Sequence, residues 1–206
     1  SENTTKDDNW TCEVQGYDGT DYETDWNNAT TLVIQNSPPS ASAVNITSTD
    51  ELNGTSADLI GVWTYGDNDS DVHSDNQTQW YNNSVKVDDL DNLETINFSN
   101  TTKGQNWTFS VRVNDGAGWS KWVNSSLITI ENTVPNTDSV TLEATDNPNN
   151  YTTADLTCIV QIADGDEDDV YANYTLYWND TINRTGQIGP FTSDVSYNII
   201  NVSSEN

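Results

Sequence analysis

The sequence predicts an all-β fold, with β-sandwiches in tandem, one complete and one divided between the two ends of the chain. Two observations support this prediction. First, NWTCEVQGYDG at residues 9–19 returns as NWTFSVRVNDG at 106–116, and both copies alternate apolar and polar residues before an Asp-Gly turn. Second, short apolar segments recur at regular spacing, and none has the period of an amphipathic helix.

The strand that begins at residue 9 is followed by an apolar segment at 31–34 and then by NSPPSA at 36–41. Two adjacent prolines cannot continue a hydrogen-bonded ladder and they stiffen a junction, so we expect a linker there. We therefore interpret residues 1–39 as the last two strands of a sandwich.

We interpret residues 40–135 as one complete domain. Its predicted strands are VNIT, TSADLIGVWTY, TQWYNN, NWTFSVRV and SSLITI, and the acidic loop GDNDSD separates the second strand from the third. The segment ENTVPNTD then repeats the linker pattern.

Residues 136–206 begin the same pattern again. TTADLTCIVQI aligns with TSADLIGVWTY, which places Cys158 on Gly61. TLYWND aligns with TQWYNN, which places Tyr177 on Trp80. The pattern stops before another NWT strand. The repeat has a period of about 96 residues, and the two terminal segments together supply roughly one further domain.

At these residues the chain resembles immunoglobulin-like domains of the kind strung in tandem in archaeal cell-surface proteins. The family pattern is a Cys on strand B, an aromatic residue on strand C and aromatic-x-Cys on strand F. It is matched here by Cys158, by the aromatic pair at 177–178 and by Trp-Thr-Cys at 10–12. The middle domain departs from the pattern, with Gly61 and Phe109 at the cysteine positions, but a large ring opposite a hydrogen atom fills a similar volume. The resemblance implies a structural role at the cell surface or outside the cell.

The resemblance also implies that Cys12 and Cys158, at strand F and strand B positions, form a disulfide across the repeat boundary. Two free, buried thiols are the alternative.

Neither terminal segment holds a whole sandwich, and an open sandwich is marginal in water. We therefore expect residues 136–206 of one copy to be completed by residues 1–39 of the next. Three arrangements achieve this: separate chains in a linear or helical filament, successive repeats of one longer polypeptide, and closure of both ends within one molecule. The short proline-containing linkers disfavour closure, and the smooth continuation from SSEN to SENTTK favours a longer polypeptide.

The charge balance argues against several partners. The formal net charge is −27, with six Lys and Arg against 33 Asp and Glu, so we expect no binding to nucleic acid or to an anionic membrane surface. No apolar run approaches the ~18 residues of a membrane span, so we expect no direct membrane insertion. His73 is the only histidine, and no phosphate-binding glycine loop is present, so we predict no enzymatic activity.

Asn-x-Ser/Thr acceptors are more frequent than chance: 17 of the 28 asparagines begin one, where roughly six or seven are expected. This density predicts an N-glycosylated protein at the cell surface or outside the cell. A polar surface that is merely rich in Asn and Thr is the alternative. The acceptors are Asn3, Asn9, Asn28, Asn45, Asn53, Asn68, Asn76, Asn82, Asn97, Asn100, Asn106, Asn124, Asn150, Asn173, Asn179, Asn183 and Asn201.

Two acidic loops carry the spacing D-x-D-x-D, which can wrap carboxylates around Ca²⁺. They are not EF-hands, because the sixth position is not Gly and the twelfth is Thr. A solvated acidic turn is the alternative, and apart from calcium and the N-linked glycans we expect no cofactor. The candidate ligands are Asp67, Asp69, Asp71, Asp164, Asp166 and Asp168.

These observations predict a structural subunit or repeat unit of a glycosylated extracellular filament, which polymerises head to tail as copies complete each other's split domains. The alternative is a cell-surface adhesin or surface-layer module that binds a glycan, a partner cell or calcium. Such a module would stack sugars on exposed rings, for which Trp26, Trp119 and Trp122 are the candidates.

Overall fold

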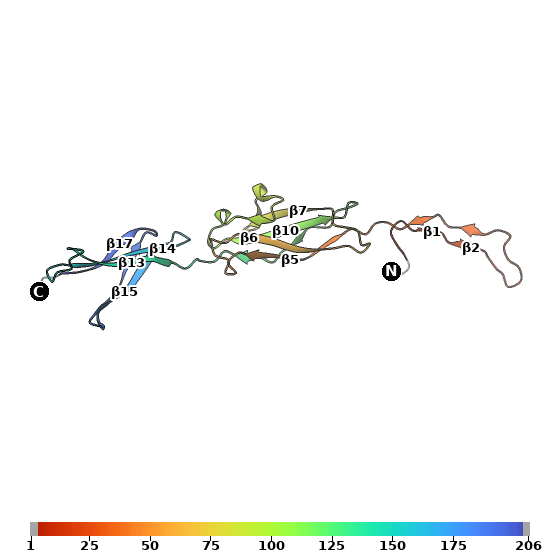
Figure 1. Cartoon of the computed structure of the whole chain (residues 1–206). Coiled ribbons are helices and arrows are strands. Elements are labelled where there is room, and N and C mark those ends of the chain that lie inside the picture. Colours follow the sequence, from red (N-terminus) through yellow and green to blue (C-terminus); the bar gives the residue numbers. More distant parts are fainter. Residues whose placement is uncertain (1–3, 204–206) are drawn as a thin grey trace. The chain divides into compact units, whose positions relative to one another are not determined.

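The structure, a computed structural model, describes residues 4–203 and is all-β, as predicted (Figure 1). The chain divides into two compact units. Of the described residues, the first comprises 4–47, 60–96 and 106–128, and the second comprises 48–59, 97–105 and 129–203. Among the described residues, no helix is long and apolar enough to cross a membrane.

The strands are β1 (Asn9–Trp10), β2 (Glu13–Val14), β3 (Asn27–Asn28), β4 (Leu32–Val33), β5 (Ser40–Ser48), β6 (Leu59–Gly66), β7 (Asp75–Asn82), β8 (Val85–Lys86), β9 (Thr95–Ile96), β10 (Asn106–Asn114), β11 (Val123–Asn124), β12 (Ile128–Thr129), β13 (Asn136–Ala144), β14 (Leu156–Ala163), β15 (Val170–Trp178), β16 (Thr181–Phe191) and β17 (Ser196–Val202). Two short 3₁₀ segments, η1 (Asp88–Leu90) and η2 (Phe98–Asn100), flank β9. Because β5 begins directly after Pro39 and β13 begins at Asn136, the last residues of both predicted linkers belong to strands.

The first unit contains a β-hairpin arm, which we define as residues 7–34. Its strands pair only with one another in the part of the chain that the structure describes: β1 with β4, and β2 with β3. The base of the arm is closed by two backbone bonds, from Asp7 N to Ile34 O at 2.9 Å and from Ile34 N to Asp8 O at 2.9 Å.

The first unit also contains nearly all of a sandwich of two sheets. One sheet has the order β11-β10-β7-β8, with β12 also paired to β10, and the other has the order β5-β6-β9. Figure 1 shows β7 and β10 side by side, and they pair antiparallel over eight positions, from Trp107 opposite Asn82 to Asn114 opposite Asp75. The alternation predicted for residues 106–114 thus forms a long strand inside its sheet.

Phe109 of β10 is fully buried between these two sheets. Its ring centroid lies 5.8 Å from that of Trp63 on β6 and 4.9 Å from that of Trp80 on β7. Gly61 of β6 makes room for the ring, because a Cβ atom added there would lie 2.4 Å from the nearest ring carbons. The core of this sandwich therefore depends on a ring packed against a residue without a side chain, as the sequence predicts.

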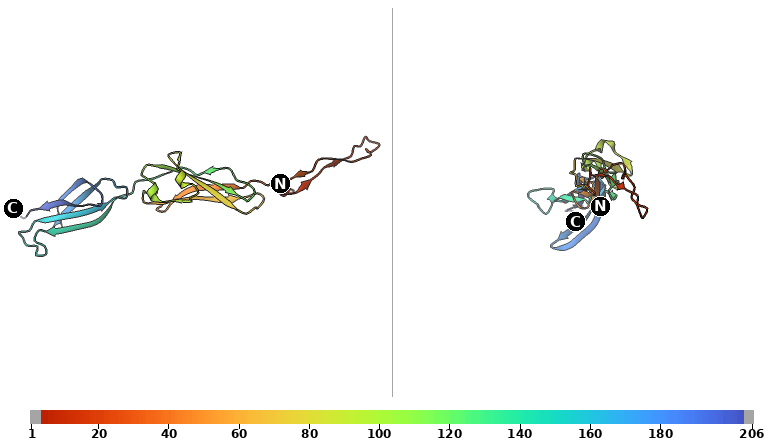
Figure 2. Two further views of the ribbon diagram at one scale, coloured as in Figure 1. Left: turned by 90° about the horizontal axis from the view of Figure 1, so that it is seen from above. Right: turned by 90° about the vertical axis from the view of Figure 1, so that its right-hand side faces the viewer.

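The second unit holds a three-stranded sheet, β13-β14-β17, and a two-stranded sheet, β15-β16. Within this unit the β15-β16 ribbon lies in a different plane from the three-stranded sheet (Figures 1 and 2). A small core joins the inner faces of the two sheets and consists of Val160, Ile162, Val170, Ala172, Ile199 and Ile200.

Candidate functional site

One face of the hairpin arm is apolar but exposed. Trp10 is 48% exposed and Val14 is 59% exposed, and Cys12 between them is also exposed. The corresponding residues of β10 are buried: Trp107 is 1% exposed, and Phe109 and Val111 are each 0% exposed. The same sequence pattern therefore forms a core strand in one place and an uncovered apolar face in the other.

The arm has the same internal hydrogen bonds as the hairpin of the complete sandwich. Ala29 N donates to Cys12 O at 2.8 Å, as Ser125 N does to Phe109 O at 2.8 Å. Glu13 pairs with Asn28 and Val14 with Asn27, as their counterparts on β10 pair with β11. The bonds at the base of the arm also recur, from Gly104 N to Ile130 O at 2.8 Å and from Ile130 N to Gln105 O at 2.9 Å. The arm is thus a pre-formed copy of the hairpin that contains β10.

The turns at the tips of the two hairpins are alike as well. Asp18 accepts bonds from Thr20 N and Asp21 N at 2.8 Å each, and these bonds lower the pKa of its carboxyl. Asp115 accepts from the backbone N–H of 117 and 118 at 2.7 and 2.6 Å. A bond from the Asn36 side chain, together with these backbone bonds, lowers the pKa of Asp115 to about 2.

The second unit has an open strand edge beside an unfilled space. Within the described residues, β15 pairs with β16 alone, whereas β7 in the first unit lies between β8 and β10. A cavity of about 280 Å³ opens next to the inner faces of β14 and β15, and its walls include Cys158, Val160, Ala172 and Tyr174. Cys158 is half-buried there and packs against the small core.

The structure corrects the alignment that placed Tyr177 on Trp80. Tyr177 is 60% exposed, and the half-buried side chains of β15 that pack on the core are Tyr174 and Leu176. The segment that runs from the acidic loop to the following turn is one residue shorter in the second unit than in the first. In the first unit that turn has positive φ at 83–84, and in the second it has positive φ at 179–180. Leu176, not Tyr177, is therefore the structural counterpart of Trp80.

The two cysteines are both free in the structure, Cys12 exposed in the first unit and Cys158 half-buried in the second. The implied pairing between copies therefore remains a prediction.

The first acidic loop is bound by a lysine and by the linker. One carboxylate oxygen from each of Asp67, Asp69 and Asp71 lies within 4.8 Å of the others. Lys6 Nζ forms an ion pair with Asp71 at 2.6 Å, and Ser37 N donates to Asp69 Oδ2 at 2.6 Å. The bond to Asp71 raises the pKa of Lys6.

The second acidic loop repeats this arrangement with equivalent residues. Lys103 Nζ pairs with Asp168 and lies 3.9 Å from Asp166. Thr133 N donates to Asp166 Oδ2 at 2.8 Å, and Thr55 also bonds to Asp166. The bond to Asp168 is the main cause that raises the pKa of Lys103.

A linker asparagine completes each arrangement. Asn36 Oδ1 accepts from Lys6 at 3.1 Å, and Asn132 Oδ1 accepts from Lys103 at 3.0 Å. We call each set of Lys, Asn, Ser or Thr, and acidic loop a lysine clasp. The D-x-D-x-D spacing predicts the carboxylates but not the lysines, although Lys6 and Lys103 both stand three residues before an NWT motif.

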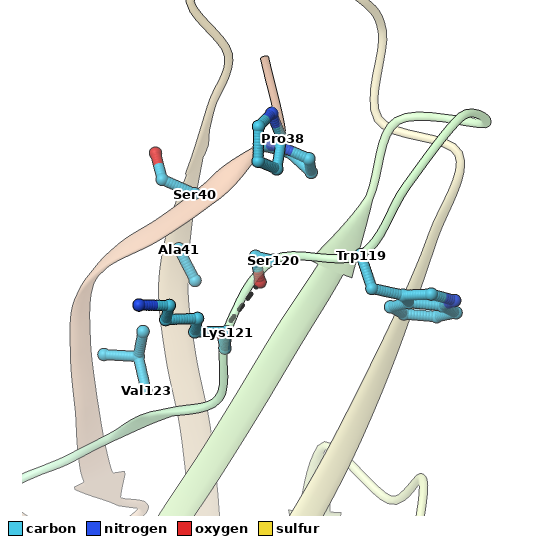
Figure 3. Close-up of a pocket in the computed structure, with 8 residues that line it drawn as sticks. Pro38, Ser40, Ala41, Trp119, Ser120, Lys121 and Val123 are labelled. Atoms are coloured by element: carbon cyan, nitrogen blue, oxygen red, sulfur yellow. Dashed lines mark hydrogen bonds between the residues drawn. The ribbon is translucent and has the colours of Figure 1, made fainter. Parts of the chain in front are cut away.

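Two of the tryptophans considered for sugar stacking contact a charged side chain. The Arg112 guanidinium lies 4.7 Å from the ring centroid of Trp119 and 5.0 Å from that of Trp122. A cleft of about 410 Å³ lies between the start of β5 and the segment 119–123, and in Figure 3 the indole of Trp119 points away from Pro38 and Ser40. Trp26 of the arm is 60% exposed.

The predicted glycan acceptors fall into two groups. Asn53, Asn76, Asn82 and Asn106 are half-buried, and Asn3 lies outside the described residues. The remaining acceptors are exposed: Asn9, Asn28, Asn45, Asn68, Asn97, Asn100, Asn124, Asn150, Asn173, Asn179, Asn183 and Asn201. His73, the only histidine, is also exposed, and its ring centroid lies 5.0 Å from that of Tyr65.

No protein-family model matches the chain, and no curated protein sequence matches it.

Proposed function

We propose that this chain is a structural subunit or repeat unit of a glycosylated extracellular filament, built from immunoglobulin-like sandwiches. Copies join head to tail when the hairpin arm of one copy completes the open sandwich of another. The copies are separate chains or successive repeats of a longer polypeptide, and the contact is the same in both cases.

One observation carries this proposal: the exposure of Trp10 and Val14 in the arm against the complete burial of Trp107 and Val111 in β10. Covering an exposed apolar face gains about 25 cal/mol per Å² of apolar area removed from water, which is the main driving force for such an association. The open edge of β15 offers unpaired backbone groups to an added strand.

The two surfaces lie on different parts of the chain, so their contact is heterologous and leaves one free arm and one open edge at the ends of every open assembly. A contact of this kind extends without closing, unless the rotation between copies happens to close a ring. The acidic composition and the exposed acceptor asparagines fit a polymer whose surface stays hydrated and resists lateral aggregation.

The experiment is electron microscopy and sedimentation of the 206-residue chain, kept reduced, over a range of concentrations. We expect linear assemblies that lengthen with concentration. The matched variants are Val14→Asp, on the apolar face of the arm, and Gln15→Asp, the next residue along the strand. We expect Val14→Asp to abolish assembly and Gln15→Asp to preserve it.

A mixing experiment tests the polarity. A Val14→Asp copy keeps a working acceptor, so a small amount added to the wild-type chain should cap assemblies and shorten them. Wild-type chains that remain monomeric at all concentrations, or assemblies that ignore the capping copy, would overturn the proposal.

A further inference from the structure

We infer the register in which a second copy of this chain binds, and this inference rests on the proposed function. Trp10, Cys12 and Val14 of the arm pair with Trp178, Leu176 and Tyr174 of β15 in the next copy. In this register the Cys12 thiol faces the Cys158 thiol.

The reference for the donor strand is β10 in the complete sandwich. The hydrogen bonds shared by the arm and the β10 hairpin make Trp10, Cys12 and Val14 the counterparts of Trp107, Phe109 and Val111. In the complete sandwich these three residues lie opposite Asn82, Trp80 and Thr78 of β7. Because the arm already has the geometry of the β10 hairpin, it can add to β15 without refolding.

The acceptor strand β15 is aligned with β7 by the turn that follows it and by the residues on its inner face. The turns at 83–84 and 179–180 make Trp178 the counterpart of Asn82 and Leu176 the counterpart of Trp80. Burial agrees, because Tyr174 and Leu176 pack on the core as Thr78 and Trp80 are buried in the first unit. A register shifted by one residue would oppose Cys12 to the exposed Tyr177 and turn the apolar face of the arm toward solvent.

The pairing of β10 with β7 also shows how closely the side chains of Cys12 and Leu176 approach each other. Val87 N donates to Trp80 O at 3.0 Å, so the backbone polar groups of Trp80 point toward β8 and away from β10. Phe109 and Trp80 are therefore a non-hydrogen-bonded pair, the kind in which facing residues come closest. The inferred pair of Cys12 and Leu176 inherits this geometry.

The packing of Phe109 against Gly61 indicates that the two thiols face each other in the joined copies. Phe109 is the counterpart of Cys12, and Gly61 is the counterpart of Cys158, which lies on the inner face of β14. A side chain at Gly61 would stand within 2.4 Å of the Phe109 ring, so side chains at these two positions share one space between the sheets. In the joined copies that space receives two cysteine side chains instead of a ring.

Formation of the disulfide needs a disulfide oxidant, and oxidised glutathione is the probe. The thiolate of one cysteine attacks glutathione disulfide, and one reduced glutathione leaves. The second cysteine then displaces the other glutathione from the mixed disulfide. The balance is two protein thiols and one oxidised glutathione giving one protein disulfide and two reduced glutathiones.

The experiment is disulfide formation in the 206-residue chain with oxidised glutathione, followed on non-reducing gels. The wild type should give a ladder of linked copies that reductant collapses, and Cys12→Ser should not. Moving the donor thiol by one residue, in Cys12→Ser/Thr11→Cys, should reduce linkage at least tenfold because that side chain leaves the shared space.

The register on β15 is tested in a Cys158→Ser background. Leu176→Cys should link with the native Cys12, whereas Tyr177→Cys should link at least tenfold less. A second pair, Trp10→Cys with Trp178→Cys in a Cys12→Ser/Cys158→Ser background, repeats the test at the exposed end of β15.

The outcomes separate this inference from the proposed function. Reduced wild-type chains that assemble, but link better through Tyr177→Cys than through Leu176→Cys, would overturn the register and leave the filament in place. Reduced wild-type chains that do not assemble would overturn both.

Discussion

Phe109 occupies the space that a side chain at Gly61 would need: a Cβ atom there would lie 2.4 Å from Cε2 and Cζ of the ring and 2.6 Å from Cδ2. This ring also packs against Trp63 and Trp80, so it cannot move away freely. The pair fills the centre of the complete sandwich by placing a large aromatic side chain on β10 opposite a residue without a side chain on β6.

Gly61→Ala should therefore destabilise the complete sandwich by about 1–3 kcal/mol, the usual cost of overpacking a well-packed core. The measurement is urea unfolding followed by tryptophan fluorescence. Gly118→Ala is the matched control, because a Cβ atom at Gly118 meets no other atom within 4 Å. Equal stability of the two variants would show that the Phe109 ring can shift.

Much of the fold could be predicted because alternation is strong where a strand is buried on one face. Residues 106–114 alternate clearly and form β10. The sequence does not predict the strand β16 at 181–191, since its side chains are mostly exposed and no apolar period marks it. Register was harder still: Tyr177 aligned with Trp80 because both are aromatic, but one residue fewer precedes the turn and Leu176 takes the inner position.

The lysine clasp in the second unit should stabilise the protein in a pH-dependent way. The folded-state pKa of Lys103 is raised above 10.5, so its contribution is fully present below pH 10.5 and is lost as pH rises through the raised value. We expect Lys103→Met to lower the unfolding temperature at neutral pH and to match the wild type above the folded pKa. Scanning calorimetry at neutral and strongly alkaline pH measures this difference.

The exposed Lys121 provides the control, because Lys121→Met removes the same charge without touching a clasp. If both variants lose the same stability at neutral pH, net charge and not the clasp is responsible.

Protonation of Asp115 should lower the stability of the folded protein in acid. Its pKa is lowered from 3.8 to about 2 in the folded state, first by the Asn36 side chain at 2.8 Å and then by backbone bonds. The contribution is therefore present above pH 3.8 and is lost as pH falls toward about 2. The acid limb of a plot of unfolding temperature against pH should be shallower in Asp115→Asn than in the wild type or in Asp89→Asn, a change at an exposed aspartate.

Glycan occupancy should follow exposure. A glycan attached to Asn must extend from the side chain into solvent. Asn76 and Asn82 are half-buried: the Asn76 side chain donates to Glu94 at 3.3 Å, and Asn82 Oδ1 is buried. We expect lower occupancy at these two positions than at exposed acceptors such as Asn97 and Asn150. Glycopeptide mass spectrometry of protein from a glycosylating source measures each position, and equal occupancy at all four would contradict the prediction.

The acidic loops show why their role could not be settled from spacing. The spacing of Asp164, Asp166 and Asp168 predicts three converging carboxylates, and they do converge within 4.8 Å. Lys103 neutralises part of their charge. It is distant from the loop in sequence, and only the fold brings its ammonium next to Asp168. A cation site and a lysine-neutralised turn have the same local pattern of aspartates.

The lysines predict how the protein responds to calcium. In each loop a lysine ammonium already balances part of the charge that a divalent cation would balance, so we expect calcium to raise the unfolding temperature of the wild type only slightly. In Lys6→Met/Lys103→Met the carboxylates lose this partner and repel one another, so calcium should stabilise that variant more than the wild type. The measurement is calorimetry in calcium chloride against a chelator, with magnesium chloride and Lys121→Met as controls. A wild-type response to calcium as large as that of the double variant would mean that lysine and calcium occupy the loops independently.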